Sequence, residues 1–192
     1  MSQGVQSFPV GRYQDIKWDL VVNEGYAEEV RWSEEVGAPE SPDTFLQEYA
    51  FVVVNSGMKN TIARAIYERV MAALSEGKAV STAFGHPGKA AAIQAVSDER
   101  VEWFSRWGDA DDKLAFLESM PWIGPITKYH LGKNYGLDLA KPDRHLVRIA
   151  EAWGAESVHE LCSGLAEASG DRIGTVDLVL WRASTLGWLL TP

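Results

Sequence analysis

Apolar side chains recur along most of the chain at the spacing of one face of an α-helix. Ile62, Ile66, Val70 and Leu74 stand four residues apart, so they fall on one side of a helix that Gly77 is expected to end. No segment alternates apolar and polar residues as a half-buried β-strand does. The pattern predicts an all-α protein of eight to ten short helices, packed as an irregular orthogonal bundle.

Residues that favour helix ends mark the expected boundaries. Ser41 followed by Pro42 is typical of an N-cap and a first helical residue, and Asn60 is the expected cap of the helix that contains Ile62. The apolar run Tyr49–Val54 has a strand-like composition, but it lies inside the helix that Ser41 opens and is interpreted as buried helix. Further helices are expected at residues 88–96, 101–107, 111–119, 125–135, 144–153, 157–170 and 176–189.

The composition is that of a globular protein. The chain has 192 residues, 46% hydrophobic and 23% charged, which suits one compact domain or two small interlocked ones. Its single cysteine, Cys162, excludes a disulfide framework, a four-cysteine iron–sulfur cluster and an all-cysteine zinc site. The longest apolar run is far shorter than the ~20 residues that span a bilayer, and the first residues lack a signal-peptide pattern. We expect a cytoplasmic, monomeric protein with no metal site and no membrane partner.

Acidic and basic residues are unevenly distributed. The net charge of −9 by itself argues against nucleic acid, because neutralisation of phosphates normally supplies most of the affinity. Residues 24–48 hold eight acidic side chains against one base, whereas residues 120–148 hold five bases against two acidic side chains. Both stretches are typical of solvated helix faces. A ligand responds to the local field, however, so the second stretch is also a candidate contact for an anion.

The segment Met120–Thr127 joins two expected helices through a tight turn. Its pattern, apolar-Pro-x-apolar-Gly, directs backbone amides and the free N–H groups of the following helix toward one point, which suits a DNA phosphate. Lys128 and Lys133 add positive charge on that helix. Gly-Pro is also simply a good turn between helices. Gly85–Lys89 is a weaker phosphate-loop candidate, interpreted as a turn and a helix start.

A second motif is Lys141–Ile149, which reads Lys-Pro-Asp-Arg-His-Leu-Val-Arg-Ile. Asp143 follows a proline and precedes an expected helix, so on its own it is best interpreted as a plain N-cap. The same carboxylate at the mouth of a cleft would stabilise positive charge on a reacting sugar. Both interpretations stay open from this residue alone.

Together the two motifs resemble the helix-hairpin-helix (HhH-GPD) DNA glycosylase superfamily, whose hairpin has the form Leu-Pro-Gly-Val-Gly and is followed by Asp-x-His-apolar-x-Arg. The matching residues are Pro121, Ile123, Gly124, Asp143, His145, Leu146 and Arg148. The resemblance covers about residues 43–153 and implies a two-lobed, all-α fold. Residues 43–137 would form a six-helix barrel lobe with the hairpin, and residues 1–42 plus 138–192 a second helical lobe, with double-stranded DNA between them.

The resemblance also implies roles for individual residues. Asp143 falls on the aspartate that supports the oxocarbenium-like sugar and orients or deprotonates water, and His145 and Arg148 are expected to support its turn. Ile126 falls where bifunctional members carry a Schiff-base lysine, and an isoleucine cannot form an imine, so no lysine-mediated strand cleavage is expected. No cofactor is expected, apart from a monovalent cation on the hairpin backbone. The expected DNA contacts are Pro121, Trp122, Ile123, Gly124, Ile126, Thr127, Lys128 and Arg144.

Two positions depart from the pattern of that superfamily. Trp122 replaces the hairpin's first glycine, and its indole is expected either to stack on a sugar or, as the favoured alternative, to pack into the barrel. The loop at residues 55–60 lies where the superfamily has a glutamine that fills the gap left by a flipped base. Gly57 stands near that position, so Asn55 or Met58 is expected to act as the wedge.

Three functions follow as hypotheses. The favoured one is a monofunctional DNA N-glycosylase that flips a modified or mismatched base and hydrolyses its glycosidic bond with an aspartate-assisted water, in a nucleoid or a phage-infected cell. The alternative is a bacteriophage-type enzyme of the same fold that modifies a flipped thymine during hypermodification. The third is a non-catalytic DNA-binding module in which Asp143 is only a cap.

Overall fold

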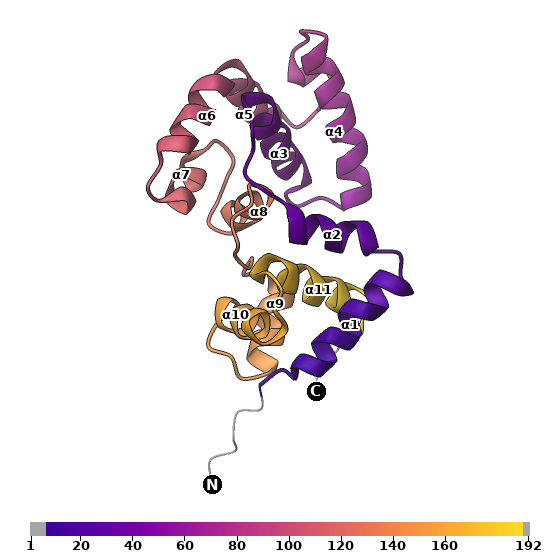
Figure 1. Cartoon of the computed structure of the whole chain (residues 1–192). Coiled ribbons are helices and arrows are strands. Elements are labelled where there is room, and N and C mark those ends of the chain that lie inside the picture. The colour runs from indigo at the N-terminus through magenta and orange to yellow at the C-terminus, as the bar shows by residue number, and fades with distance from the viewer. Residues whose placement is uncertain (1–6, 190–192) are drawn as a thin grey trace. The chain divides into compact units, whose positions relative to one another are not determined.

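The computed structural model describes residues 7–189, which form eleven α-helices, one short 3-10 helix and no β-strand (Figure 1). The prediction of an all-α protein is confirmed, with one helix more than the expected maximum. No helix in the described range is both long and apolar enough to cross a bilayer. The chain divides into two compact units: unit 1 is Met1–Gly37 with Leu137–Pro192, and unit 2 is Ala38–Gly136. The assignment of these units to glycosylase lobes stays a prediction.

Unit 1 is organised around its last helix. Its helices are α1 (Val10–Val22), α2 (Ala27–Glu35), α9 (Arg144–Ala152), α10 (Val158–Ser169) and α11 (Ile173–Thr185). Helix α11 packs against each of the other four. It does so with fully buried side chains at helical spacing, namely Val176, Val179, Leu180 and Ala183. The core of unit 1 therefore joins residues from both ends of the sequence.

Unit 2 is organised around its first helix. Its elements are α3 (Pro42–Asn55), α4 (Asn60–Ser75), the 3-10 helix η1 (Val80–Thr82), α5 (Pro87–Asp98), α6 (Arg100–Asp109), α7 (Lys113–Ser119) and α8 (Thr127–Asn134). Helix α3 contacts α4, α5, α6 and α8. The apolar run Tyr49–Val54 lies within α3, and Tyr49, Val52 and Val53 have no exposed surface. Its interpretation as buried helix is confirmed.

The capping residues explain several helix boundaries. The Ser41 hydroxyl accepts the Thr44 N–H over 3.1 Å with Pro42 as the first helical residue, and the Ser157 hydroxyl accepts the Glu160 N–H over 3.0 Å. Gly77 and Gly170 adopt φ of 68° and 81°, the left-handed conformation typical of residues that end helices.

Two predicted boundaries are wrong. Asn60 is the first residue of α4 rather than its cap, and no side-chain bond caps that helix. The last helix runs from Ile173 to Thr185 instead of 176–189, because Arg172 already has the extended backbone of an N-cap position.

Candidate functional site

The turn between α7 and α8, residues 120–126, is fixed by the core of unit 2. Met120 and Ile123 are 2% and 6% exposed, and the Ile123 N–H donates to the Met120 carbonyl oxygen. The Tyr49 hydroxyl of α3 donates to the Pro121 carbonyl oxygen over 2.7 Å. The turn is therefore held through its apolar side chains and one carbonyl group, and its amide groups are not needed for that attachment.

The first turn of α8 has unused hydrogen-bond donors. No side chain caps this helix, although the Lys128 N–H donates to the Gly124 carbonyl and the Tyr129 N–H to the Ile126 carbonyl. Within the described part of the chain, the N–H groups of Gly124, Ile126 and Thr127 donate no hydrogen bond. Such donors at the positive end of a helix dipole favour an anion. The phosphate contact that the sequence analysis anticipates at this turn stays a prediction.

Gly124 is not required by the fold of this chain. Its φ is outside the left-handed region, and an added Cβ atom would meet no atom within 4 Å. Glycine costs conformational entropy on folding relative to other residues. Neither backbone conformation nor internal packing therefore explains the glycine at position 124.

Several carbonyl groups of the turn are already engaged in hydrogen bonds. The Met120, Pro121 and Gly124 oxygens accept from Ile123, Tyr49 and Lys128 respectively. Each carbonyl oxygen has a second lone pair, and the monovalent cation stays a prediction. Among residues 7–189, no group of three or more His, Cys, Asp or Glu side chains is placed to hold a metal ion.

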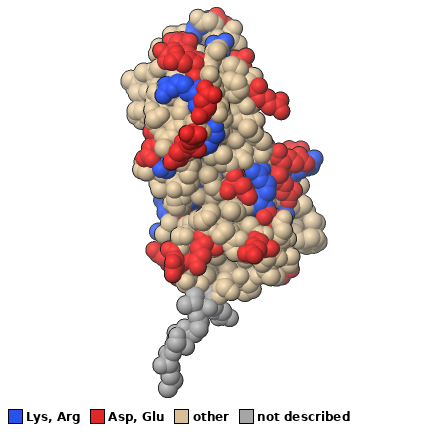
Figure 2. Space-filling view, turned by 60° about the vertical axis from the view of Figure 1, so that its left-hand side comes forward, with Lys and Arg blue, Asp and Glu red and all other residues tan. Residues whose placement is uncertain are grey.

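Lys128, one of the expected DNA contacts, is paired within unit 2. Its Nζ atom lies 2.5 Å from Glu118 Oε2, and this hydrogen bond raises the pKa of the Lys128 ammonium. Part of its charge is therefore balanced inside the chain. On the face shown in Figure 2, the described Lys and Arg side chains likewise lie among Asp and Glu side chains. The bases on this face therefore lie in a field of mixed sign and not in a basic patch.

Trp122 differs from the favoured expectation that it packs into a barrel. It is 46% exposed, whereas the core tryptophan Trp107 is 5% exposed. Its backbone has φ 64°, and it is the one non-glycine residue of the described chain with positive φ, a conformation that costs about 1 kcal/mol or more. The indole lies against the start of α5, with its ring centroid 5.1 Å from that of His86. An added Cβ at Gly88 would lie 2.5 Å from Trp122 Cζ3.

The expected wedge residues lie at the end of α3. Asn55 is the last residue of that helix, and its Oδ1 atom is buried with no hydrogen-bond partner among the described residues. Gly57 has φ 70°, which fits glycine at a tight turn, and the Met58 N–H donates to the Asn55 carbonyl. Met58 is half-buried. Asn55 thus keeps an unused acceptor at the position proposed to fill the gap of a flipped base.

Lys89 is a buried ammonium group that the sequence analysis missed. It stands in the first turn of α5, is 5% exposed, and donates from Nζ to the Val54 and Ser56 carbonyl oxygens over 3.1 and 2.6 Å. Burial lowers the pKa of this amine. The bonds attach α5 to the end of α3 next to the wedge loop. Its position in Gly85–Lys89 was the available signal, but a plain turn was the favoured interpretation.

Asp143, in unit 1, is the N-cap of α9. Its Oδ1 atom accepts the N–H groups of His145 and Leu146 over 2.9 and 3.1 Å. Its Oδ2 atom accepts no hydrogen bond within the described chain. Asp143 is half-buried. The two interpretations of this residue are therefore compatible, because one oxygen caps the helix while the other remains open.

The segment before Asp143 is attached to α11. The Lys141 N–H donates to Asp177 Oδ2 over 2.5 Å, and the Asp143 N–H donates to the Lys141 carbonyl over 2.7 Å. Asp177 is 3% exposed. Sequence reasoning did not identify it, because nothing in the sequence indicates that a carboxylate of the last helix accepts this amide.

Of the two residues expected to support Asp143, His145 contacts its carboxylate, and it does so through the backbone. The His145 N–H is one of the two donors to the Asp143 carboxylate, but its imidazole Nδ1 is 3.1 Å from the Ser184 hydroxyl of α11. Arg144 and Arg148 are exposed. Both are accessible to an anionic partner, and no described contact of either with the Asp143 side chain is found.

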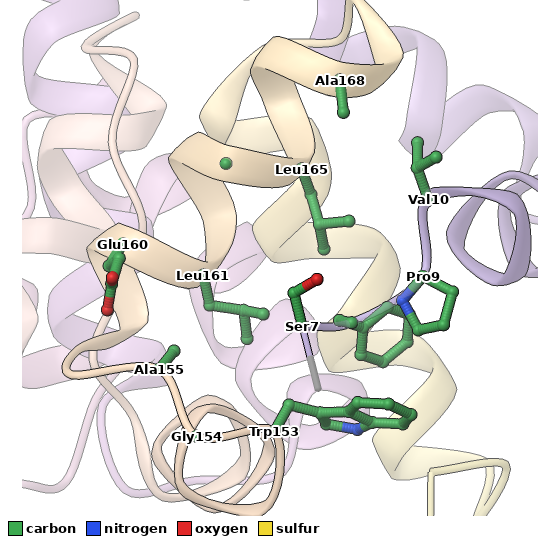
Figure 3. A pocket seen from close by; sticks show the side chains of 12 residues that line it. Ser7, Pro9, Val10, Trp153, Gly154, Ala155, Glu160, Leu161, Leu165 and Ala168 are labelled. Carbon is green, nitrogen blue, oxygen red and sulfur yellow. The ribbon is translucent and has the colours of Figure 1, made fainter. Parts of the chain in front are cut away.

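A separate pocket of about 420 Å³ lies in unit 1 and does not include any predicted site residue (Figure 3). Its walls are mostly apolar, with Phe8, Trp153, Leu161 and Leu165 among them and Glu160 at its polar side. The Glu160 carboxylate already accepts the Glu156 N–H over 2.5 Å. The pocket therefore presents hydrophobic surface and little chemistry.

Comparison of the chain with protein-family models, with curated proteins and with solved structures gives no match.

Proposed function

We propose that this protein is a monofunctional DNA N-glycosylase that acts on a modified or mismatched base. The observation that carries the proposal is that the two oxygen atoms of the Asp143 carboxylate differ in their hydrogen bonds. Its Oδ1 atom is fixed by two backbone N–H groups, so the side chain has a defined orientation, and its Oδ2 atom has no partner within the described chain. A fixed carboxylate with one open oxygen suits the stabilisation of a developing positive charge.

In the proposed reaction, the bond between the sugar C1′ atom and the base nitrogen breaks, and the base leaves with the electron pair. Asp143 stabilises the resulting oxocarbenium-like sugar and orients a water molecule, whose oxygen forms the new bond to C1′. The proton released by this water passes through the carboxylate or solvent to the departing base. Ile126 offers no amine, so this proposal includes no imine and no strand cleavage.

Phosphate binding is assigned to the first turn of α8. The open amides of Gly124, Ile126 and Thr127 supply the donors, and Gly124, which the fold does not require, keeps them accessible. Binding that relies on amides rather than on lysines is compatible with the negative net charge of the chain. The proposal predicts that affinity decreases as salt concentration increases, as for any phosphate contact.

The experiment compares binding to duplexes that carry a neutral abasic analogue or a cationic pyrrolidine analogue. Because the cation mimics charge present only in the transition state, the wild-type protein should prefer it by tenfold or more, about 1.4 kcal/mol. Asp143→Asn should lose this preference, since asparagine caps a helix as well as aspartate but carries no charge. Equal binding of the two analogues by the wild type would contradict the proposal and favour base modification or simple binding.

Matched control variants distinguish the effect of the Asp143 charge from that of a helix cap. They also distinguish the effect of the turn at residues 120–126 from that of the carboxylate. Asp112 caps α7 in the same manner, with its Oδ1 atom accepting the Ala115 N–H, so Asp112→Asn should keep the full preference. Gly124→Ala should weaken binding of both analogues equally. The control for that variant is Gly108→Ala in α6, another glycine with open space around its Cβ position, which should leave binding unchanged.

A further inference from the structure

The position of the Trp122 indole depends on two residues, Trp122 and Gly88, and each of them is an unfavourable choice for its own backbone position. Trp122 has φ 64°, which glycine adopts freely and a tryptophan adopts only under strain. Gly88 lies in the first turn of α5, where alanine would favour the helix more than glycine does. An added Cβ at Gly88 would collide with the indole at 2.5 Å. The absence of a side chain at Gly88 therefore leaves space for the indole, which the strained backbone of Trp122 places next to α5.

Core formation does not explain this arrangement. Trp122 keeps 46% of its surface exposed, whereas Trp107 in the core of unit 2 keeps 5%. Its recorded ring neighbour is His86, whose own side chain is exposed and meets the indole at an interplanar angle of 79°. Locally unfavourable choices that still leave nearly half of a large aromatic side chain exposed are typical of sites that contact a ligand.

The neighbours of Trp122 in the sequence indicate the ligand. The turn that carries the indole also carries the open amides of Gly124, Ile126 and Thr127. Amides suit a phosphate, and a large aromatic surface suits the planar ring of a base. In an intact duplex both faces of a base are covered by stacking, so only an unpaired base is available to such a surface.

We propose that Trp122 is a stacking platform for an unpaired nucleobase of the DNA strand whose phosphate the turn at residues 120–126 binds. The platform is held in place by contact with Gly88 and His86. This inference rests on the proposed DNA binding, but not on the proposed hydrolysis of the glycosidic bond.

The test measures the affinity of the protein for three duplexes. One is fully paired, one contains a single unpaired nucleotide, and one contains the same bulge with an abasic analogue in place of that nucleotide. The wild type should prefer the bulge with a base over the abasic bulge by about tenfold, about 1.4 kcal/mol. Trp122→Gly should remove this preference, and Trp122→Phe should keep most of it because a ring remains.

Gly88→Ala tests the position of the ring without altering the ring itself. In the wild-type background it should displace the indole and reduce the preference for the unpaired base, whereas in the Trp122→Gly background it should have no further effect. Trp18→Ala removes an exposed tryptophan of α1 and should leave the preference unchanged. Glycine relieves the strain at position 122, so the urea midpoint of Trp122→Gly reports whether any loss of binding comes from unfolding.

The outcomes distinguish the two proposals. If the wild type binds none of the three duplexes, the proposed function itself is wrong. If it binds them but shows no preference for the unpaired base, or if Trp122→Gly retains the preference, Trp122 is not a stacking platform while DNA binding stands. Destabilisation of Trp122→Gly together with an unchanged preference in Gly88→Ala would assign Trp122 a purely structural role.

Discussion

Helices α5 and α8 of unit 2 follow similar glycine- and proline-containing turns and are both attached to α3, yet their first turns differ. At α5, His86 Nδ1 accepts the Lys89 N–H over 3.3 Å, and the Lys89 ammonium group donates to carbonyl oxygens at the end of α3. At α8, no side chain caps the helix and three amides of the turn stay without acceptors. The side chains of His86 and Lys89 thus make hydrogen bonds at the start of α5, whereas backbone donors remain without acceptors at the start of α8.

The attachment of α8 to α3 lies away from its open donors. The Tyr49 hydroxyl binds the Pro121 carbonyl, the Tyr135 hydroxyl binds the Phe45 carbonyl over 2.7 Å, and Asn134 Nδ2 donates to Glu48 Oε2 over 2.8 Å. All three contacts use groups other than the first-turn amides. The comparison shows that the first-turn amides of a helix can stay available for a ligand when other groups of the helix and of the preceding turn attach it to the core.

The largest expected effect comes from removing the Lys89 hydrogen bonds that attach the first turn of α5 to the end of α3. Lys89→Met keeps the length of the side chain but leaves the Val54 and Ser56 carbonyls without their donor, and hydrogen bonds to charged groups contribute about 2 kcal/mol. We expect the free energy of unfolding to fall by about 2 kcal/mol in urea titrations. Lys128→Met, also in the first turn of its helix, is the control and should change stability little, because it removes only the ion pair with the exposed Glu118 carboxylate. Similar losses in both variants would remove the distinction between the two turns.

A smaller effect is expected from loosening the anchor of the α8 turn. Tyr49→Phe retains the buried ring but removes the hydrogen bond to the Pro121 carbonyl, which contributes about 1 kcal/mol. Hydrogen exchange should become faster at the hydrogen-bonded amides of Met120, Ile123 and Lys128 before it changes in α5. Exchange that increases equally in both helices would mean that this bond stabilises unit 2 as a whole and not the turn in particular.

The smallest effect concerns the other end of α8, and it depends on pH. Burial raises the pKa of the Glu48 carboxyl above its usual 4.5, with the hydrogen bond from Asn134 opposing the shift. The folded state therefore binds this proton more tightly than the unfolded state does. The contribution of Glu48 to stability is complete below pH 4.5 and is lost as the pH rises through the raised pKa.

Glu48→Gln tests this sign. Glutamine still accepts a hydrogen bond from Asn134 but stays neutral, so at pH 7 the variant should be more stable than the wild type in urea titrations. Its advantage should vanish near pH 3.5, about one unit below the usual carboxyl pKa. DNA binding should not change, since the first turn of α8 is untouched. An advantage that persists in acid would attribute the gain to packing.

Local features of the fold were predictable from the sequence, and tertiary ones were not. Ser41, Ser157 and Gly170 act through residues within one helical turn, so their roles follow from spacing alone. Asp143 is also a local cap, as its position after Pro142 indicated. By contrast, the burial of Lys89 depends on the end of α3, and the position of the Trp122 indole depends on Gly88 of α5. Such contacts join distant segments and leave no periodic signal.

The candidate site follows the same division. The open amides of the α8 turn follow from the Gly-Pro sequence, because backbone donors at a helix start are a local property. The unused Oδ2 atom of Asp143 and the buried acceptor of Asn55 are properties of the folded chain. The sequence identifies the carboxylate of Asp143, but only the contacts in the folded chain determine which of its two oxygens accepts no hydrogen bond.

The central position of α11 in unit 1 has a consequence for the order of events during synthesis. The helices of unit 2 are all contained in residues 38–136, so this unit is complete while the ribosome is still adding the later chain. Helices α1 and α2 emerge first, but α11, against which both pack, emerges last. The faces of α1 and α2 that pack on α11 therefore stay uncovered until after unit 2 has been synthesised, and unit 2 can fold before the unit that flanks it in sequence.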